Sequence, residues 1–304
     1  TPAARANDAT DVWAARHGDY LSHAAQPFRS ASIDHIQCGK LDCDRDGGEF
    51  PGANLGLYSV TYLNDLEQDK RTLEAFHAFR EEAERKQFRY FLEVFDPNIE
   101  SGIPPEKLGE FINDQILRTL AGIAEAGRPD FLKIVYHGPR LMEEICQYDP
   151  NLIVGVLGGS AGTTYDAFRL LHDAKKHGAR VALFGRKINN AEHQLAFIEF
   201  LRLIAEDTIG PEEAVHAYHG VLQGKGITPK LSLEQDLELT EQSMRYSDTD
   251  GKPRVAIRNN PLAKSKLQSS QPVSPWPIKS SGAPDFASMS ADQRLAYHTA
   301  RLKQ

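Results

Sequence analysis

The chain has 304 residues and a formal net charge of −7 at pH 7, and 40% of its residues are hydrophobic. This is an ordinary globular composition, and the length accommodates a barrel of ~250 residues. The acidic balance, without any basic block, disfavours a nucleic-acid partner. No apolar run approaches the ~18 residues of a membrane span and no signal peptide is visible, so we expect no membrane partner and a cytoplasmic location.

The cysteines are Cys38, Cys43 and Cys146. Three is too few for a disulfide framework, and the odd number favours reduced thiols, as in a cytoplasmic protein. His35 lies near the first two, but their spacing matches no zinc motif. We therefore expect neither a metal nor an organic cofactor.

The first 54 residues give mixed signals. Residues 1–11 are polar and rich in Ala, and we expect them to be frayed or to form a leader. Residues 12–29 favour a helix that Pro27 ends. The apolar content of residues 32–41 favours a strand, and the Asp, Gly and Pro residues of 42–54 predict a loop.

From residue 56 onwards, short apolar runs alternate with amphipathic segments, which is typical of a parallel sheet with crossover helices. The predicted strands are 56–63, 88–95, 131–136, 152–157 and 180–185. The predicted helices are 66–86, 106–126, 140–148, 164–177, 192–207 and 212–223. Together with 32–41 this gives six strands, whereas a (β/α)8 barrel needs eight. Because the N-terminal residues are too few for two more βα units, the first strands are not identifiable.

The composition changes after the last of these helices, where Pro, Ser and Lys become frequent and large apolar residues rare. We predict a barrel domain over 1–224 and a C-terminal extension over 225–304 that packs on the barrel or on a neighbouring subunit of a homo-oligomer. A disordered tail is the alternative. A short helix over 290–302, capped by Ser290, is expected near the end.

Several polar residues lie at the carboxyl ends of the predicted strands, where parallel α/β folds bind ligands. Lys133 is set among apolar residues. If it is buried, the neutral amine is favoured and is a nucleophile towards carbonyls. An ion-paired or snorkelling lysine is the alternative. Turns after the next two strands could bring backbone N–H groups to an anion; they contain Gly158, Gly159, Ser160, Gly185 and Arg186.

Four segments together resemble a known family. DFLKIVYHG (130–138) resembles the Schiff-base lysine strand of class I aldolases of the DeoC/LacD group, which includes the tagatose-bisphosphate and archaeal-type fructose-bisphosphate aldolases. Residues 154–188 resemble the seventh and eighth strands of that barrel. YFLEVFDPN (90–98) and GLYSVTYLND (56–65) resemble two earlier strands. The resemblance covers roughly residues 30–205, and its strength lies in the order and spacing of the motifs.

The resemblance implies a (β/α)8 (TIM) barrel and a catalytic lysine. Lys133 would form an imine with a phosphorylated ketose, and Glu93 would exchange the proton. An ion pair with a lysine or arginine is the alternative for Glu93, and a core role is the alternative for Tyr136, which matches a family tyrosine. Phe95 stands near the catalytic tyrosine of the archaeal branch, so that branch's mechanism does not carry over. The implied phosphate ligands are Gly158, Gly159, Ser160, Gly185 and Arg186.

The sequence therefore predicts a class I aldolase, a carbon–carbon lyase that binds a sugar phosphate. Two alternatives remain open. One is a sugar-phosphate barrel without imine chemistry, such as an isomerase or epimerase. The other is a non-catalytic sensor or structural subunit that keeps the phosphate pocket. The acid that the family carries on an early strand has no counterpart that can be placed in this chain.

Overall fold

The computed structural model shows two compact units, residues 1–157 with 179–181 and residues 158–178 with 182–304. This division differs from the predicted boundary after residue 224, and that domain assignment stays a prediction. The structure describes residues 2–7, 23–44, 50–159, 162–240, 277, 279, 284–290, 293–294 and 297. Residues 241–276 of the predicted C-terminal extension lie outside these residues.

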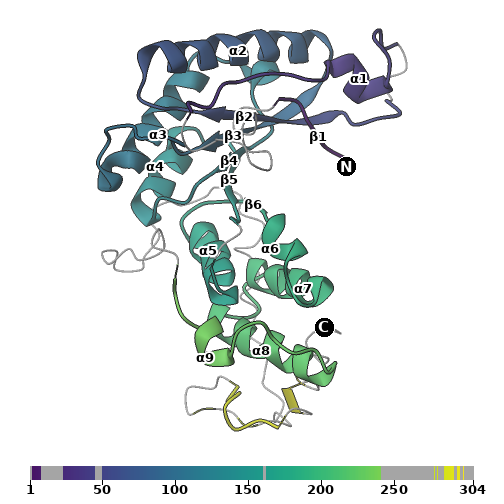
Figure 1. Cartoon of the computed structure of the whole chain (residues 1–304), viewed down its shortest axis with the longest axis vertical. Helices are drawn as coiled ribbons and strands as arrows, with labels where there is room; N and C mark the ends of the chain where they lie inside the picture. The colour runs from purple at the N-terminus through teal and green to yellow at the C-terminus, as the bar shows by residue number, and fades with distance from the viewer. Residues whose placement is uncertain are drawn as a thin grey trace. The chain divides into compact units, whose positions relative to one another are not determined.

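The chain has an α/β fold built on a sheet of six strands that follow one another in chain order (Figure 1). The four pairings from β1 to β5 are all parallel, as predicted. In the described residues β1 and β6 are the two ends of this order, so closure into an eight-stranded barrel stays a prediction. The strands are β1 Ala4–Arg5, β2 Leu55–Thr61, β3 Arg89–Phe95, β4 Leu132–Ile134, β5 Val154–Leu157 and β6 Val181–Leu183.

The predicted strand over 32–41 is wrong, because this segment contains the helix α1, Ile33–Cys38. Ser32 caps its first turn by accepting a hydrogen bond from the backbone N–H of His35 at 3.2 Å. Gly39 ends the helix with a φ of 69°, a left-handed conformation that glycine adopts without steric cost. The buried residues of this short helix are Ile33, Asp34 and Gln37, so apolar and polar side chains share its buried side.

On the edge of β2 away from β3, the neighbouring strand is β1, which lies in the segment that we predicted to be frayed. Ala4 pairs with Gly56, and Arg5 pairs with Leu57. The predicted helix over 12–29 is also wrong where it can be checked, because residues 23–29 are not helical. Its remaining part, 12–22, lies outside the described residues.

Helix α2, Leu66–Arg85, packs against one face of the sheet. Phe76 and Phe79 on this helix contact Tyr58 of β2, with ring centroids 5.4 and 4.2 Å away, and Tyr90 of β3. Because side chains alternate along a strand, the neighbours of Tyr58 and Tyr90 in sequence point to the opposite face. The remaining helical elements of this unit are α3 Pro105–Leu120, the 3₁₀ turn η2 Glu125–Gly127 and α4 Pro139–Tyr148.

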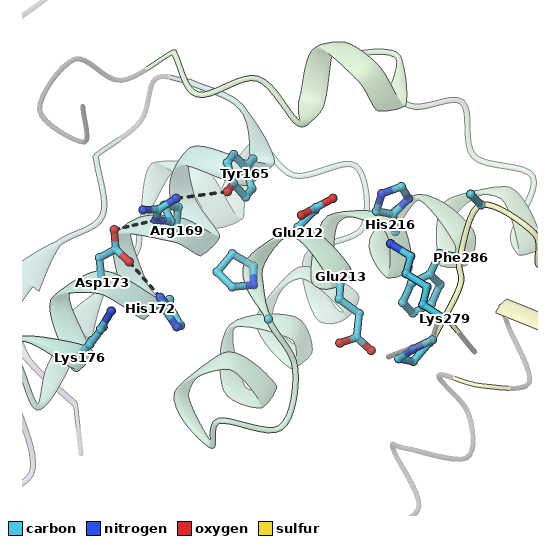
Figure 2. A pocket seen from close by; sticks show the side chains of 14 residues that line it. Tyr165, Arg169, His172, Asp173, Lys176, Glu212, Glu213, His216, Lys279 and Phe286 are labelled. Carbon is cyan, nitrogen blue, oxygen red and sulfur yellow. Dashed lines mark hydrogen bonds and ion pairs between the residues drawn. The ribbon is translucent and has the colours of Figure 1, made fainter. Parts of the chain in front are cut away.

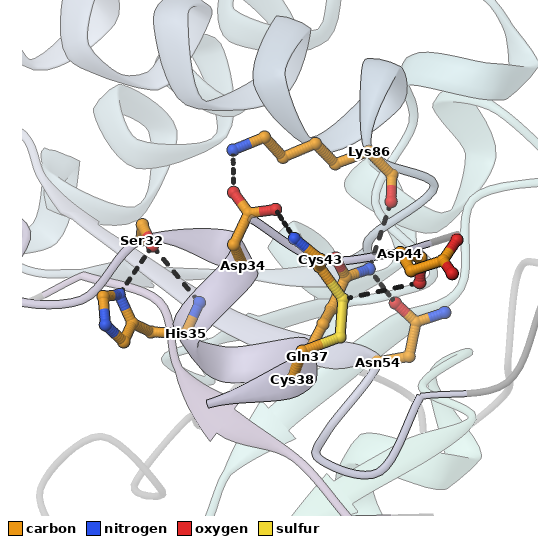
Figure 3. The surroundings of a disulfide bond; sticks show 9 residues. All are labelled: Ser32, Asp34, His35, Gln37, Cys38, Cys43, Asp44, Asn54 and Lys86. Carbon is orange, nitrogen blue, oxygen red and sulfur yellow. Dashed lines mark hydrogen bonds and ion pairs between the residues drawn. A yellow bond between two sulfur atoms is a disulfide. The ribbon is translucent and has the colours of Figure 1, made fainter. Parts of the chain in front are cut away.

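Cys38 and Cys43 form a disulfide, so the prediction of reduced thiols is wrong for this pair (Figure 3). Their Cα atoms are 5.7 Å apart, within the range that a disulfide spans. The backbone N–H of Cys43 donates to Asp34 at 3.1 Å, and Asp34 is paired with Lys86 at the end of α2. The disulfide and these contacts together fasten the chain after α1 to α2. Disulfides of this kind are typical of oxidising compartments, and the cytoplasmic location stays a prediction.

The second unit is built on α5 Thr164–Lys176, α6 Arg186–Asn189, α7 Gln194–Ala205, α8 Pro211–Gly224 and α9 Leu233–Asp236. Its core packs Phe168, Phe197, Phe200 and Tyr218 from three of these helices. Asp236 of α9 accepts a hydrogen bond from the Thr164 backbone at 2.6 Å and contacts His219 at 2.9 Å. One carboxylate thus joins α9 to α5 and α8.

The described part of the C-terminal extension packs within this second unit. The ring of Phe286 stacks on His216 of α8, and Phe286, Met289 and Tyr297 form a small buried cluster. Ser290 accepts a hydrogen bond from the Gln293 backbone at 3.2 Å, as expected for the predicted cap. Within the described residues, none of the helices combines the length and the hydropathy needed to cross a membrane.

Candidate functional site

Three polar residues lie side by side on one face of the sheet in the first unit. The strand register places Ser59 of β2 opposite Glu93 of β3, and Glu93 opposite Lys133 of β4. Tyr58 and Tyr90 point to α2, so alternation places Ser59 and Glu93 on the other face. We call Ser59, Glu93 and Lys133 the polar row.

The polar row is one continuous chain of contacts. The Lys133 amine forms an ion pair with Glu93 Oε1, and the Ser59 hydroxyl donates to Glu93 Oε2 at 2.9 Å. Glu93 is 2% exposed, whereas the Lys133 side chain is 19% exposed. Both oxygens of the buried carboxylate are therefore satisfied, and the amine is its only counter-charge in the row.

Asn7, two residues after the end of β1, fixes the position of Ser59. Its side-chain amide donates to the Ser59 carbonyl at 2.8 Å, and its side-chain oxygen accepts from the Ser59 backbone N–H at 2.6 Å. This pair of hydrogen bonds replaces the ladder bonds that a longer β1 would make. A side chain from the start of the chain thus determines where the Ser59 hydroxyl lies.

An aromatic layer lies on the amino-terminal side of the polar row. Phe91 and Phe131 precede Glu93 and Lys133 by two residues, so they share the same face, and their rings stack with centroids 4.5 Å apart. Thr61 follows Ser59 by two residues, towards the carboxyl end of β2. Its hydroxyl oxygen is buried and has no hydrogen-bond partner in the part of the chain that the structure describes.

The row can carry out proton transfer between an amine and a carboxylate. The Lys133 amine forms an ion pair with Glu93, and imine formation requires this amine in its neutral form. Glu93 Oε1 contacts that amine and is the acceptor within reach of its proton. The structure therefore brings together the predicted lysine and the predicted glutamate, in the ion pair that was the alternative reading for Glu93. Tyr136, just beyond β4, is buried at 2% exposure.

The described members of the predicted phosphate site belong to the second unit, whereas Lys133 and Glu93 belong to the first. The backbone N–H of Gly158 donates to the carbonyl of Leu183 at 2.9 Å, so that donor is already used. A Cβ at Gly158 would lie 2.1 Å from the Phe184 ring, which gives a packing reason for the glycine. Gly159 has a φ of 60°, which favours glycine.

Gly185 and Arg186 form the start of α6, and both are exposed. The helix is only four residues long, and Gly185 is its N-cap. Arg186 brings the one positive charge of the predicted phosphate set. Ser160 lies outside the described residues, so the site cannot be assembled in full and stays a prediction.

Ser59 and Asn7 were not singled out from the sequence. Ser59 lies within the GLYSVTYLND segment, but nothing in that segment marks it as a site residue, and Asn7 belongs to no motif. Nor did the sequence indicate the contact between His137, which follows β4, and Asp96, which follows β3. His137 Nε2 and Asp96 Oδ1 are 2.9 Å apart. A Cβ at Gly109 of α3 would lie 2.6 Å from the Cβ of His137, so the histidine packs closely under that helix. The register between β2 and β3, which the sequence does not show, is what brings Ser59 to Glu93.

The second unit contains a cavity of about 460 Å³ (Figure 2). Residues of one face of α5, the first turns of α8 and part of the C-terminal extension line it. On α5, Asp173 contacts Arg169 Nε at 2.7 Å and His172 Nδ1 at 2.9 Å. Burial opposes ionisation of Asp173, but the hydrogen bonds from His172 and Arg169 outweigh it and hold its pKa below the usual range.

The described residues contain no group of three or more His, Cys, Asp or Glu side chains arranged to hold a metal ion. No protein-family model matches the chain, and no curated protein matches it in a sequence search. No relative therefore supports or contradicts the resemblance to class I aldolases. What the chain does has to be inferred from the polar row, the cavity and their surroundings.

Proposed function

We propose that the protein is a carbon–carbon lyase of the class I aldolase type, which acts on a phosphorylated ketose through an imine at Lys133. The observation that carries this proposal is the contact of the Lys133 amine with the buried carboxylate of Glu93 on one face of a parallel sheet. The aromatic layer of Phe91 and Phe131 closes the row on its amino-terminal side. Substrate would enter from the carboxyl ends of the strands, the usual side in such folds.

In this mechanism Glu93 accepts a proton from the Lys133 ammonium, and the free amine adds to the substrate ketone. Loss of water gives a protonated imine, which withdraws electrons from the neighbouring C–C bond. A base removes the proton of the substrate hydroxyl as that bond breaks, an aldehyde leaves, and an enamine remains. Protonation of the enamine and hydrolysis of the imine release the second product and restore the amine.

Ser59 has a positioning role in this proposal. Its hydroxyl occupies Glu93 Oε2, so Oε1 is left for Lys133. Asn7 in turn fixes the Ser59 backbone. Arg186 would contribute a positive charge that attracts the substrate phosphate. The same proposal includes a barrel closed by eight strands and a homo-oligomer of such barrels.

Borohydride trapping tests the imine. The whole protein would be incubated with a panel of ketose phosphates and borohydride, and peptide mass spectrometry would locate any adduct. We expect a substrate-dependent adduct on Lys133 that is lost in Lys133→Met and kept in Lys70→Met, where an exposed lysine is removed. No adduct with any ketose phosphate, or adducts spread over surface lysines, would overturn the proposal.

A second candidate is a sugar-phosphate protein without imine chemistry. The observation in its favour is that Glu93 is fully satisfied by Lys133 and Ser59, the arrangement expected of a structural ion pair. An isomerase or epimerase would keep its turnover in Lys133→Met. A sensor would bind phosphosugars in the wild type and convert none of them.

A further inference from the structure

The cavity of the second unit is built from three segments far apart in sequence. Helices α5 and α8 and the C-terminal extension each contribute two or more of its lining side chains (Figure 2), among them Arg169 and Lys176, Glu212 and His216, and Lys279 and Phe286. A volume of about 460 Å³ is in the range of small-molecule sites. Part of the cavity wall is thus formed by the extension where it packs onto α8.

The extension is held on α8 by specific contacts. The ring of Phe286 lies nearly parallel to that of His216, with centroids 6.0 Å apart and an interplanar angle of 10°. The Tyr297 hydroxyl donates to Glu213. Arg294 lies over Gly220, one turn after His216 on α8, where a Cβ would be 3.1 Å from the Arg294 Cβ. His216 and Arg294 are therefore on the same side of the helix.

Two basic groups have buried nitrogen atoms without partners among the described residues: His216, which lines the cavity, and Arg294, which lies beside the lining against Gly220 of the same helix. Neither His216 Nδ1 nor Arg294 Nε has a hydrogen-bond partner in the part of the chain that the structure describes, and both atoms are buried. Lys279, beside His216 in Figure 2, is exposed. Buried polar atoms in native proteins are nearly always hydrogen-bonded, so two such orphans together indicate a missing acceptor.

The acidic groups of the cavity do not meet this need. Asp173 already contacts Arg169 and His172, and Glu213 accepts from Tyr297. Glu212 is exposed at the first turn of α8. No carboxylate in the described residues forms an ion pair with Lys279 or Arg294, which leaves a cluster of basic groups with an unused capacity to bind an anion.

We propose that His216, Lys279 and Arg294 bind the anionic group, a carboxylate or a phosphate, of a small organic molecule that occupies this cavity. Arg294 Nε and the His216 ring would donate to its oxygens, and the Lys279 amine would add charge. The ring of Phe286 would keep the imidazole in its orientation. This site shares no residue with Lys133 and its neighbours, so it stands or falls independently of the aldolase proposal.

Binding should also change the protonation of His216. Burial lowers the pKa of this imidazole, as do Arg294, Lys279 and His219, while Glu212 acts in the opposite direction. A bound anion would add a negative charge and raise that pKa. The ring would then take up a proton on binding at neutral pH.

The experiment uses the full chain with inorganic phosphate in one arm and acetate in the other. Imidazole NMR signals, assigned to His216 through His216→Gln, would be followed in both titrations, and calorimetry would give the affinities. We expect one anion to shift the His216 signals, and Arg294→Gln to weaken its binding about tenfold or more, since a charged hydrogen bond is lost. Lys225→Met removes an exposed lysine of the same unit that does not line the cavity, and it should leave the affinity unchanged.

The choice of anion would identify the ligand class, phosphate esters or carboxylic acids. Unchanged His216 signals in the wild type at high millimolar concentrations of both anions would overturn the proposal. Equal loss of binding in Arg294→Gln and Lys225→Met would overturn it too, because that pattern indicates nonspecific attraction. Thermal unfolding of each variant without anion separates loss of the site from loss of the fold.

Discussion

Replacing Lys133 by methionine would leave the carboxylate of Glu93 without its counter-charge. Glu93 is 2% exposed, so water cannot take over the role of the amine, and only the Ser59 hydroxyl would remain. Breaking a buried ion pair from one side costs about 3–5 kcal/mol of the free energy of unfolding. Lys133→Met should therefore lose about that much, in urea unfolding followed by circular dichroism and extrapolated linearly.

Two further variants refine this expectation. Glu93→Gln leaves behind the Lys133 amine, which is 19% exposed and can reach water, so it should cost less than Lys133→Met. The double variant should be more stable than the sum of the single losses implies, by about 0.5–3 kcal/mol of coupling.

The matched control is Lys70→Met, whose partner Glu74 is exposed, with an expected loss of about 0–1 kcal/mol. If Lys133→Met lowers the free energy of unfolding no more than Lys70→Met does, water reaches the Glu93 carboxylate, and the reasoning about the polar row is refuted.

Two other outcomes follow from contacts elsewhere in the chain. Burial opposes ionisation of Asp236, but hydrogen bonds from His219 and the Thr164 backbone outweigh it and hold the pKa of this carboxyl below the ordinary 3.8. The ionised carboxylate therefore stabilises the fold above pH 3.8, and this stabilisation is lost as the pH falls through the lower pKa of the folded state. Asp236→Asn should lower the free energy of unfolding by about 3 kcal/mol near neutrality and by less in acid, and an equal loss at both pH values would contradict this reasoning. Alkylation of the denatured, unreduced chain should label Cys146 alone, with Cys38 and Cys43 labelled only after reduction; mass spectrometry that finds all three labelled at once would exclude the disulfide.

The parallel sheet could be predicted because its strands are short apolar runs between amphipathic helices, and the predicted helix 66–86 matches α2, Leu66–Arg85. The segment 32–41 was misread because apolar content does not distinguish a strand from a short buried helix. Its cap residues, Ser32 and Gly39, carried the information that apolar content lacked. β1 gave no signal, since two residues form no periodic pattern.

Lys133 could be singled out because a charge inside an apolar strand is conspicuous, and Glu93 because YFLEVFDPN resembles a strand of the aldolase family. The contact between these two side chains could not be predicted, because it depends on the register between β3 and β4. Ser59 and Asn7 are small polar residues of a kind found in any loop, and only the folded chain shows what they hold. The basic cluster of His216, Lys279 and Arg294 likewise depends on where the C-terminal extension packs.

Asn7 holds Ser59 from a position 52 residues earlier in the chain. A change of backbone position at Asn7 would therefore act on Glu93 through Ser59 without touching the side chain of either residue.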